Sequence, residues 1–251
     1  MAGPKTPLLP PEIVALENYL QKGGRLIVLL NPEQEGGLSN FLALWKITLH
    51  NDIVVDTNPL NRLMGLGPAA PMLQPYEGAE SHPVVQSLQE PAVMFTARSL
   101  GIAQGGLPGV EVLPLFESGE SAWGETNLKE GSAALDDKDY KGPVILLALA
   151  QKPVGDFDKR TPLARLLVGG DSDWLNNRFL PMQGNRDLFM NLIHYLVEEE
   201  SKMTIRPKSR TATQLFLSWS QLTEIKFFVL DLLPVLLVAA GLGIVLIRRQ
   251  R

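Results

Sequence analysis

The residues best suited to chemistry lie in the turn 169–177, whose sequence is GGDSDWLNN. Asp171 and Asp173 supply two carboxylates around Ser172, and Asn177 adds a side-chain amide. This turn leaves the C-terminal end of a predicted apolar strand, which is where open α/β sheets bind ligands. The carboxylates could hold a cation, or Ser172 and nearby backbone amides could contact an anion. We retain these four residues as possible ligand-binding residues.

A structural role is the alternative for the same turn, and we favour it. Asp171 or Ser172 would accept hydrogen bonds from the free amides of a helix start, and the two glycines would form the bend. Two carboxylates alone make a poor metal site.

Ser121 is the second candidate, because residues 119–123 have the sequence GESAW and follow a possible strand. This pattern resembles a nucleophile elbow, in which a serine occupies a sharp turn between a strand and a helix. Trp123 replaces the closing glycine, however, and no good helix follows. An ordinary loop serine is the alternative that we favour, although a hydrolase or transferase using Asp171, Asp173 or Ser121 stays open.

Composition excludes several other classes of chemistry. The three histidines, His50, His82 and His194, are scattered and do not have a metal-ligand spacing such as HExxH. The sequence has no cysteine, so thiol nucleophiles and disulfides are excluded. It has no Walker A motif and therefore does not itself hydrolyse ATP in that way. We expect no metal, no cofactor and no catalytic residue. A net charge of −4 argues against nucleic acid as a partner.

The elements that would position these residues are predicted by apolar periodicity. Residues 26–30, 144–150 and 163–168 are unbroken apolar runs, which are typical of strands covered on both faces. Helices are predicted from Pro11 to about Lys22, at 38–46 and at 185–197, where Asn191 and His194 are expected to face water. Residues 52–56 would be a strand that completes a right-handed βαβ unit. Residues 92–95 and 110–116 would be further strands, 83–88 a short helix, and 57–78 and 118–140 surface excursions.

The last stretch of the chain, residues 227–247, predicts a transmembrane helix. It is apolar apart from Asp231, and about 21 residues at roughly 1.5 Å each match the roughly 30 Å hydrocarbon core. The predicted anchor residues are Phe227, Asp231, Pro234, Gly241, Gly243, Arg248 and Arg249. We therefore expect a soluble α/β domain at 1–200, a basic juxtamembrane linker with an interfacial helix at 201–225, the span at 226–248 and a cytoplasmic tail at 249–251.

Several segments together resemble a known family. They are YLQKGGRLIVLLNP at 19–32, HPV at 82–84, SAW at 121–123, ARLLVGGDSDWLNN at 164–177, GNRDLFMNLIHYL at 184–196 and IRPK at 205–208. The chain resembles the membrane-anchored auxiliary subunits of uncharacterised ABC-type transport systems, a group that includes the gliding-motility G protein.

The resemblance implies an α/β fold with a mostly parallel sheet sandwiched by helices, similar to class I glutamine amidotransferases or to Rossmann-like folds, plus the C-terminal transmembrane helix. It implies a non-catalytic accessory or binding subunit in the bacterial inner membrane, with an extracytoplasmic domain. Its partners would be a permease, a separate ATPase, membrane lipid and an unknown small-molecule or envelope ligand. Similar proteins also carry an N-terminal span, and residues 2–5 have the composition of a loop after a strand. We therefore suspect that upstream sequence is missing. A purely structural envelope component is the further alternative.

Overall fold

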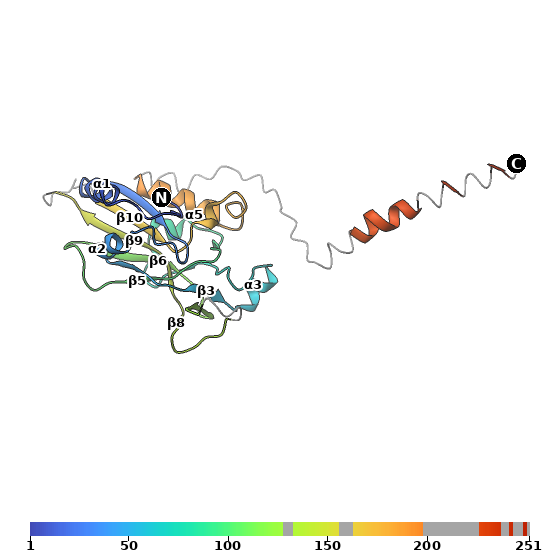
Figure 1. Cartoon of the computed structure of the whole chain (residues 1–251), viewed down its shortest axis with the longest axis horizontal. Coiled ribbons are helices and arrows are strands. Elements are labelled where there is room, and N and C mark those ends of the chain that lie inside the picture. The colour runs from blue at the N-terminus through green and yellow to red at the C-terminus, as the bar shows by residue number, and fades with distance from the viewer. Residues whose placement is uncertain (128–132, 156–162, 198–225, 237–240, 243–247, 250–251) are drawn as a thin grey trace. The chain divides into compact units, whose positions relative to one another are not determined.

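The computed structural model describes residues 1–127, 133–155, 163–197, 226–236, 241–242 and 248–249. The chain divides into two compact units, Met1–Pro207 and Lys208–Arg251. The first unit contains both β-sheets and most of the helices (Figure 1).

The described residues of the first unit form six helices, none longer than 12 residues. They are α1 (Pro10–Gln21), α2 (Ser39–Leu44), α3 (Pro59–Leu63), α4 (Pro83–Gln86), the 3-10 helix η1 (Asp173–Leu175) and α5 (Asn185–Leu196). The strands are β1 (Arg25–Leu29), β2 (Ile47–Leu49), β3 (Ile53–Asp56), β4 (Gln74–Pro75), β5 (Leu100–Ile102), β6 (Glu111–Glu117), β7 (Ala122–Glu125), β8 (Tyr140–Lys141), β9 (Ile145–Pro153) and β10 (Leu163–Gly169). Long connections therefore account for much of the unit.

The main sheet has seven strands and mixed pairing. Its path runs β1-β10-β9-β5-β2, and β9 also pairs with β6, which in turn pairs with β4. Only β1 and β10 run parallel to each other, whereas every other pair of named strands in the sheet is antiparallel. A second sheet, in the order β3-β7-β8, is antiparallel throughout.

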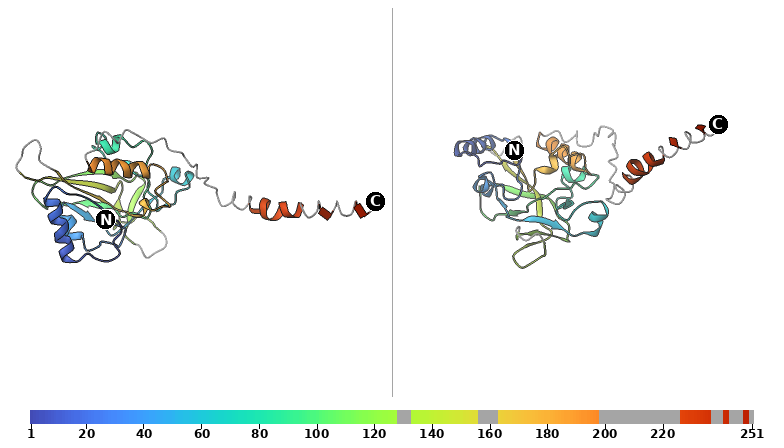
Figure 2. Two further views of the ribbon diagram at one scale, coloured as in Figure 1. Left: turned by 90° about the horizontal axis from the view of Figure 1, so that it is seen from above. Right: turned by 45° about the vertical axis from the view of Figure 1, so that its right-hand side comes forward.

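Each face of the main sheet packs an apolar cluster. Along β1, Ile27 contacts the cluster that includes Leu188 and Leu192 of α5, whereas Val28 belongs to the cluster on the other face with Leu20 of α1. Figure 2 shows α5 and α1 on opposite sides of the sheet. Because both faces are buried, β1, β9 and β10 carry apolar residues at successive positions.

The predicted fold class is therefore wrong. The predicted strands at 26–30, 144–150 and 163–168 exist, but the sheet that they form is mixed and largely antiparallel rather than mostly parallel between layers of helices. The apolar runs report burial on both faces, and burial does not distinguish parallel from antiparallel neighbours. The βαβ prediction fails for the same reason, because β3 pairs with β7 in the second sheet rather than with β1.

Two segments between the main elements also differ from the prediction. Residues 118–140 were expected to be a loop, but they contain β7 and the start of β8. Residues 92–95 were expected to form a strand, but they contribute only an isolated bridge between Val93 and Met72. β7 and the segment 92–95 each have only four residues, and so short a stretch leaves little periodicity to recognise.

The predicted C-terminal transmembrane helix is also corrected. Among the residues that the structure describes, no helix combines the length and apolar composition needed to cross a membrane. The described helical stretch from Lys226 to Leu236 includes the π-helix η3 (Phe227–Leu232). Phe227, Asp231 and Pro234 lie in this stretch, Gly241, Arg248 and Arg249 lie in short described pieces beyond it, and Gly243 lies outside the described residues.

Candidate functional site

The turn that follows β10 is organised around Asp171, which is fully buried. Its Oδ2 accepts a hydrogen bond of 2.7 Å from the backbone N–H of Phe95, and its Oδ1 accepts one of 2.6 Å from the N–H of Asp173. Asp171 therefore joins the end of β10 to the connection before β5. This is the contact that the structural interpretation of the turn expects, although the amide of Phe95 does not belong to a helix start.

Burial raises the pKa of Asp171 to about 7, and the neighbouring carboxylate of Asp173 adds to this effect. The hydrogen bonds from the amides of Phe95 and Asp173 act in the opposite direction, because they stabilise the charged form. Desolvation is the largest cause, since the carboxyl group has no contact with solvent.

Asn31, at the end of β1, connects the rest of the predicted site to the sheet. Its Oδ1 accepts a hydrogen bond of 2.7 Å from the N–H of Ser172, and its Nδ2 donates one of 3.3 Å to Oδ2 of Asp173. Ser172 and Asp173 thus lie beside the C-terminal ends of β1 and β10. Asn177 is exposed beyond η1. The structure brings three of the four predicted residues together.

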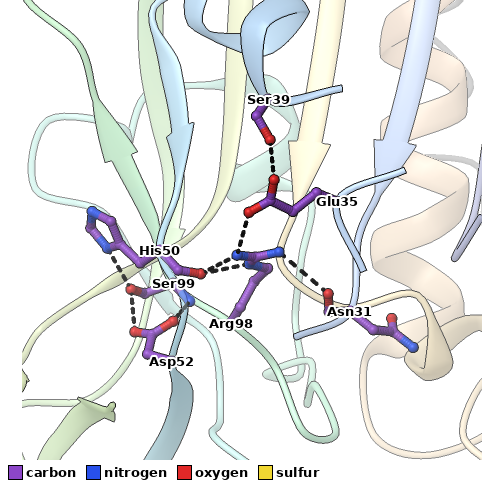
Figure 3. A network of polar contacts seen from close by, with 7 residues as sticks. All are labelled: Asn31, Glu35, Ser39, His50, Asp52, Arg98 and Ser99. Atoms are coloured by element: carbon purple, nitrogen blue, oxygen red, sulfur yellow. Dashed lines mark hydrogen bonds and ion pairs between the residues drawn. The ribbon is translucent and has the colours of Figure 1, made fainter. Parts of the chain in front are cut away.

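A larger polar network lies at the same end of β1 and is centred on Arg98, which is 1% exposed (Figure 3). Its Nε donates to the backbone oxygen of His50 at 2.7 Å, its Nη2 donates to the same oxygen, and its Nη1 lies 3.5 Å from the backbone oxygen of Asn31. Its carboxylate partner, Glu35, lies 3.9 Å away and is 49% exposed. Glu35 in turn accepts a hydrogen bond from the hydroxyl of Ser39. Arg98 therefore joins the loop after β1 to the connection between β2 and β3.

The neighbouring residue, Ser99, links a carboxylate to an imidazole. Its hydroxyl donates to Oδ2 of Asp52 at 2.5 Å, its N–H donates to Oδ1 at 2.9 Å, and its Oγ lies 2.8 Å from Nδ1 of His50. The pKa of His50 is lowered overall, and burial is the largest cause. The negative charge of Asp52 acts to raise this pKa, and the positive charge of Arg98 acts to lower it further. The ring of His50 stacks on Tyr140 of β8, with 3.9 Å between centroids. Figure 3 shows the chain from Asp52 through Ser99 to His50.

The order of these three groups differs from that of a nucleophilic triad. In a triad the imidazole lies between the carboxylate and the hydroxyl and takes the hydroxyl proton. Here the hydroxyl of Ser99 lies in the middle, donates a hydrogen bond to Asp52, and is fully buried. A substrate cannot reach it. The geometry is that of a brace between the β2–β3 connection and the start of β5.

Ser121 is held in a comparable way by Asp56, which is 2% exposed. The hydroxyl of Ser121 donates to Oδ1 of Asp56 at 2.9 Å, and Oδ2 of Asp56 accepts from Nδ2 of Asn61 at 2.7 Å. The N–H of Asn58 also donates to Asp56, at 2.9 Å. Asp56 thus fixes α3 and the start of β7. In the described part of the chain, none of the three histidines hydrogen-bonds to this serine.

The other two histidines lie away from this end of the sheet. His82 caps α4, where its Nδ1 accepts a hydrogen bond of 3.3 Å from the N–H of Val84, and burial lowers its pKa to about 4. His194 lies on α5 and is half-buried. Asn191 of the same helix is 4% exposed, so the prediction that it faces water is wrong. Across the described ranges, no group of three or more His, Asp or Glu side chains could hold a metal ion.

Sequence reasoning missed Arg98, Ser99 and Asp52. Arg98 and Ser99 lie 48 and 47 residues from the partners that they contact, His50 and Asp52, in a segment with no motif. The local signal available was the pair of polar residues flanking Asn51 between two strands, and such pairs are common in turns.

Comparisons with known proteins place the chain in a family and show one clear fold likeness. A family model described as "ABC-type uncharacterized transport system" matches residues 1–195. The N-terminal domain of mmIFT52 is similar in fold, with a TM-score of 0.53 at 15% identity over 78% of this chain and 75% of that one. A putative ThuA-like protein from Bacteroides uniformis matches at a TM-score of 0.36 and 11% identity, over 82% of this chain and 68% of that one. No curated protein is significantly similar to the chain.

At 15% identity, the likeness to the mmIFT52 domain shows a shared fold alone. The family model carries more, because it covers most of the first compact unit, including both sheets, Asp171 and the Arg98 network. Its description names a transport system and not gliding motility. The chain therefore belongs to the family of auxiliary components of ABC-type uncharacterised transport systems.

Proposed function

We propose that this chain is a non-catalytic auxiliary subunit that works with a permease and a separate ATPase of an ABC-type transport system. The observation that carries the proposal is the family match over residues 1–195. The sequence contributes no Walker A motif, so the ATPase would be a different polypeptide.

The hydrogen-bond geometry of the candidate site supports a non-catalytic role. Both oxygens of Asp171 accept backbone amides, Ser99 donates to Asp52, and Ser121 donates to Asp56. Nucleophilic catalysis needs a base within hydrogen-bond reach of an accessible hydroxyl. In these clusters the carboxylates accept hydrogen bonds from groups that hold connections in place. A small-molecule or envelope ligand would then bind without being chemically changed.

Association with the membrane is the second part of the proposal. In the described stretch from Lys226 to Leu236, seven large apolar side chains are each 52% to 67% exposed, and they lie all around the helix. An apolar surface without a polar face is stable only against lipid or another apolar partner. We propose that this stretch holds the chain at the membrane beside the permease, with Met1–Pro207 on the extracytoplasmic side.

The decisive experiment is co-expression of the full chain with the tagged permease and the ATPase of its transport system. We expect all three proteins to purify together in detergent, and a chain that purifies alone would refute the proposal. Protease treatment of intact spheroplasts should digest the Met1–Pro207 unit if it is extracytoplasmic, and protection would refute that placement.

The non-catalytic part needs its own test. Asp173 is exposed, so Asp173→Asn removes its charge while the fold should remain. Transport by the reconstituted complex should be unchanged in this variant. A loss of transport with normal assembly would favour a catalytic or ligand-binding carboxylate instead.

A further inference from the structure

Arg98 carries a positive charge into the protein interior without a close anionic partner. It is 1% exposed, and its described hydrogen bonds go to neutral backbone oxygens, those of His50 and Asn31. In its described ion pair, with Glu35, Nη2 and Oε1 lie 3.9 Å apart, which is too far for a hydrogen bond. A buried cation is costly unless it is both paired and hydrogen-bonded. The guanidinium is therefore left with donors that a closer anion would satisfy.

The nearby carboxylates do not offset the burial of this charge. The pKa of Arg98 is lowered overall, with burial as the largest cause, although the negative charges of Glu35 and Asp52 act to raise it. Asp52 uses both of its oxygens to accept hydrogen bonds from Ser99. A further anion in direct contact with Arg98 would stabilise its charged form.

Glu35 occupies the position of such an anion with few contacts of its own. Its side chain is 49% exposed, and among the described residues its carboxylate pairs or hydrogen-bonds only with Arg98 and with the hydroxyl of Ser39. Figure 3 shows this carboxylate between the two groups, with one oxygen toward each. The backbone of the loop is fixed separately, because the N–H of Leu38 donates to the backbone oxygen of Glu35 at 3.0 Å. Rotation of the Glu35 side chain into solvent would free the position without moving the loop.

The position also lies where a ligand can meet the sheet. β1 and β10 are parallel, so their C-terminal ends lie at the same edge. At this edge the backbone oxygen of Asn31 accepts from Arg98, and its side-chain oxygen accepts from the N–H of Ser172. Open sheets bind ligands outside the carboxyl ends of parallel strands. Because Glu35 is half-exposed and covers the buried guanidinium, a ligand that displaces its side chain reaches Arg98 from solvent.

Geometry and charge select a carboxylate as the ligand group. The two oxygens of Glu35 already face Nη2 of Arg98 and the hydroxyl of Ser39, so a planar carboxylate fits between these donors. A guanidinium binds carboxylates through two parallel N–H groups, and Nη1 has only a 3.5 Å contact with Asn31 to give up. A phosphate carries roughly two negative charges, and the buried carboxylate of Asp52 opposes the second.

We propose that Arg98 and Ser39 bind the carboxylate group of a small organic acid, and that Glu35 competes for the same position. This inference names the chemical class of ligand for the proposed auxiliary subunit, and in that respect it rests on the proposed function. Because the competing carboxylate is tethered to the chain, its effective concentration is high. A simple acid therefore binds the wild type weakly, and removal of the Glu35 side chain strengthens binding.

The test uses the full chain purified in detergent, with acetate titrated against chloride at constant ionic strength. Calorimetry measures binding, and the thermal midpoint measures stabilisation. Glu35→Ala removes the atoms that acetate replaces. It should lower the midpoint, because Arg98 loses its carboxylate partner, and acetate should raise the midpoint again. The dissociation constant for acetate should be about tenfold or more lower in Glu35→Ala than in the wild type.

Matched controls isolate the Arg98 position. Glu33 is exposed in the same loop, and in the described part of the chain the ion pair of Arg98 is with Glu35 instead, so Glu33→Ala should bind acetate as the wild type does. Acetamide is neutral and should not raise the midpoint of Glu35→Ala, and phosphate should raise it less than acetate does. Adding Ser39→Ala to Glu35→Ala should weaken acetate binding by about fivefold, because a donor to the anion is lost.

The outcomes separate this inference from the proposed function, because acetate binding is measured without permease or ATPase. If Glu35→Ala binds acetate no more tightly than Glu33→Ala does, or if acetamide acts as acetate does, this inference is overturned. A response to phosphate as large as that to acetate overturns the choice of a carboxylate. If the chain instead passes these tests but does not purify with the permease and the ATPase, the proposed function fails and the carboxylate site stands.

Discussion

Acid should destabilise this protein through His82, and the structure gives the size of the effect. His82 is 9% exposed, and its ring lies 4.4 Å from the ring of Tyr195. Its Nδ1 accepts from the N–H of Val84, so the neutral ring carries its proton on the buried Nε2. Protonating Nδ1 would break the cap of α4 and bury a positive charge beside Arg165, whose guanidinium lies 4.5 Å from the centroid of the same tyrosine ring.

Burial, followed by the charge of Arg165, lowers the pKa of His82 to about 4 in the folded protein, whereas the unfolded value is near 6.5. Between these two pH values the unfolded chain binds a proton that the folded chain does not. The contribution of His82 to the free energy of unfolding therefore falls as the pH drops from about 6.5 toward about 4, and it falls no further below that; the raised pKa of Asp171 acts in the opposite direction over this range and cancels in the comparison of wild type with variant. At 1.36 kcal/mol per pH unit, the loss by about pH 4.5 is about 2.5 kcal/mol.

The assay is urea unfolding of the full chain at about pH 7.5 and about pH 4.5, for the wild type and for His82→Asn. Asparagine is a favourable N-cap and can accept from the N–H of Val84, but it does not titrate. The difference in unfolding free energy between wild type and variant should therefore shift by about 2.5 kcal/mol in favour of the variant on acidification.

Tyr195→Phe is the matched control for this experiment. It keeps the ring beside His82 and removes only the hydroxyl that accepts a 3.2 Å hydrogen bond from Gln151. Its acid loss should equal that of the wild type. If His82→Asn loses as much stability in acid as the wild type, the assignment of the effect to His82 is refuted.

Three further changes test the braces between connections by the free energy of unfolding in urea. Ser99→Ala removes a donor to the fully buried Asp52 and should cost about 2 kcal/mol, so an unchanged midpoint would contradict this brace. Gly124→Ala would place a Cβ 1.9 Å from Oδ2 of Asp52 and should cost about 1–3 kcal/mol, whereas a neutral result would mean that Asp52 moves away freely. Ser121→Ala removes one of the donors to Asp56 and should cost about 1 kcal/mol, and a stabilised variant would refute its structural role.

The sequence predicts β1, β9 and β10 of the main sheet because their signal is local, whereas the short strands β2, β4 and β5 are not predicted. Residues 26–30, 144–150 and 163–168 contain enough apolar side chains to indicate burial on both faces, and β1, β9 and β10 occupy nearly these positions. The direction of their neighbours is not a local property. It depends on how each strand pairs with its neighbours: β9 and β10, which are consecutive strands, pair antiparallel.

Part of the candidate site could likewise be predicted from local sequence, and part of it could not. The turn after β10 could be found because Asp171, Ser172 and Asp173 are adjacent in sequence, and the alternative that Asp171 accepts backbone amides describes its contacts, although one of those amides comes from Phe95, 76 residues away. The Arg98 network could not be found, because its residues come from three separate connections and are ordinary polar residues there. The contribution of this network to stability depends on the burial of its residues, and burial is a property of the fold as a whole.

Buried carboxylates also explain why residues that look reactive in the sequence are engaged in hydrogen bonds in the structure. This unit has few helices, so its long connections must satisfy many backbone amides without regular secondary structure. Asp52, Asp56 and Asp171 each lie in such a connection or at its start, and each accepts at least two hydrogen bonds. An ionised carboxylate offers about four acceptor positions and suits this task.

Because Asp52, Asp56 and Asp171 are buried, they offer no accessible oxygen to a substrate in solvent, and these buried carboxylates are therefore a poor guide to what the protein binds. Leu60 and Leu63 of α3 are the opposite case, because both are exposed while Asn61 between them is buried and donates to Asp56. The hydrogen bond to Asp56, and not apolar burial, therefore sets the orientation of this helix.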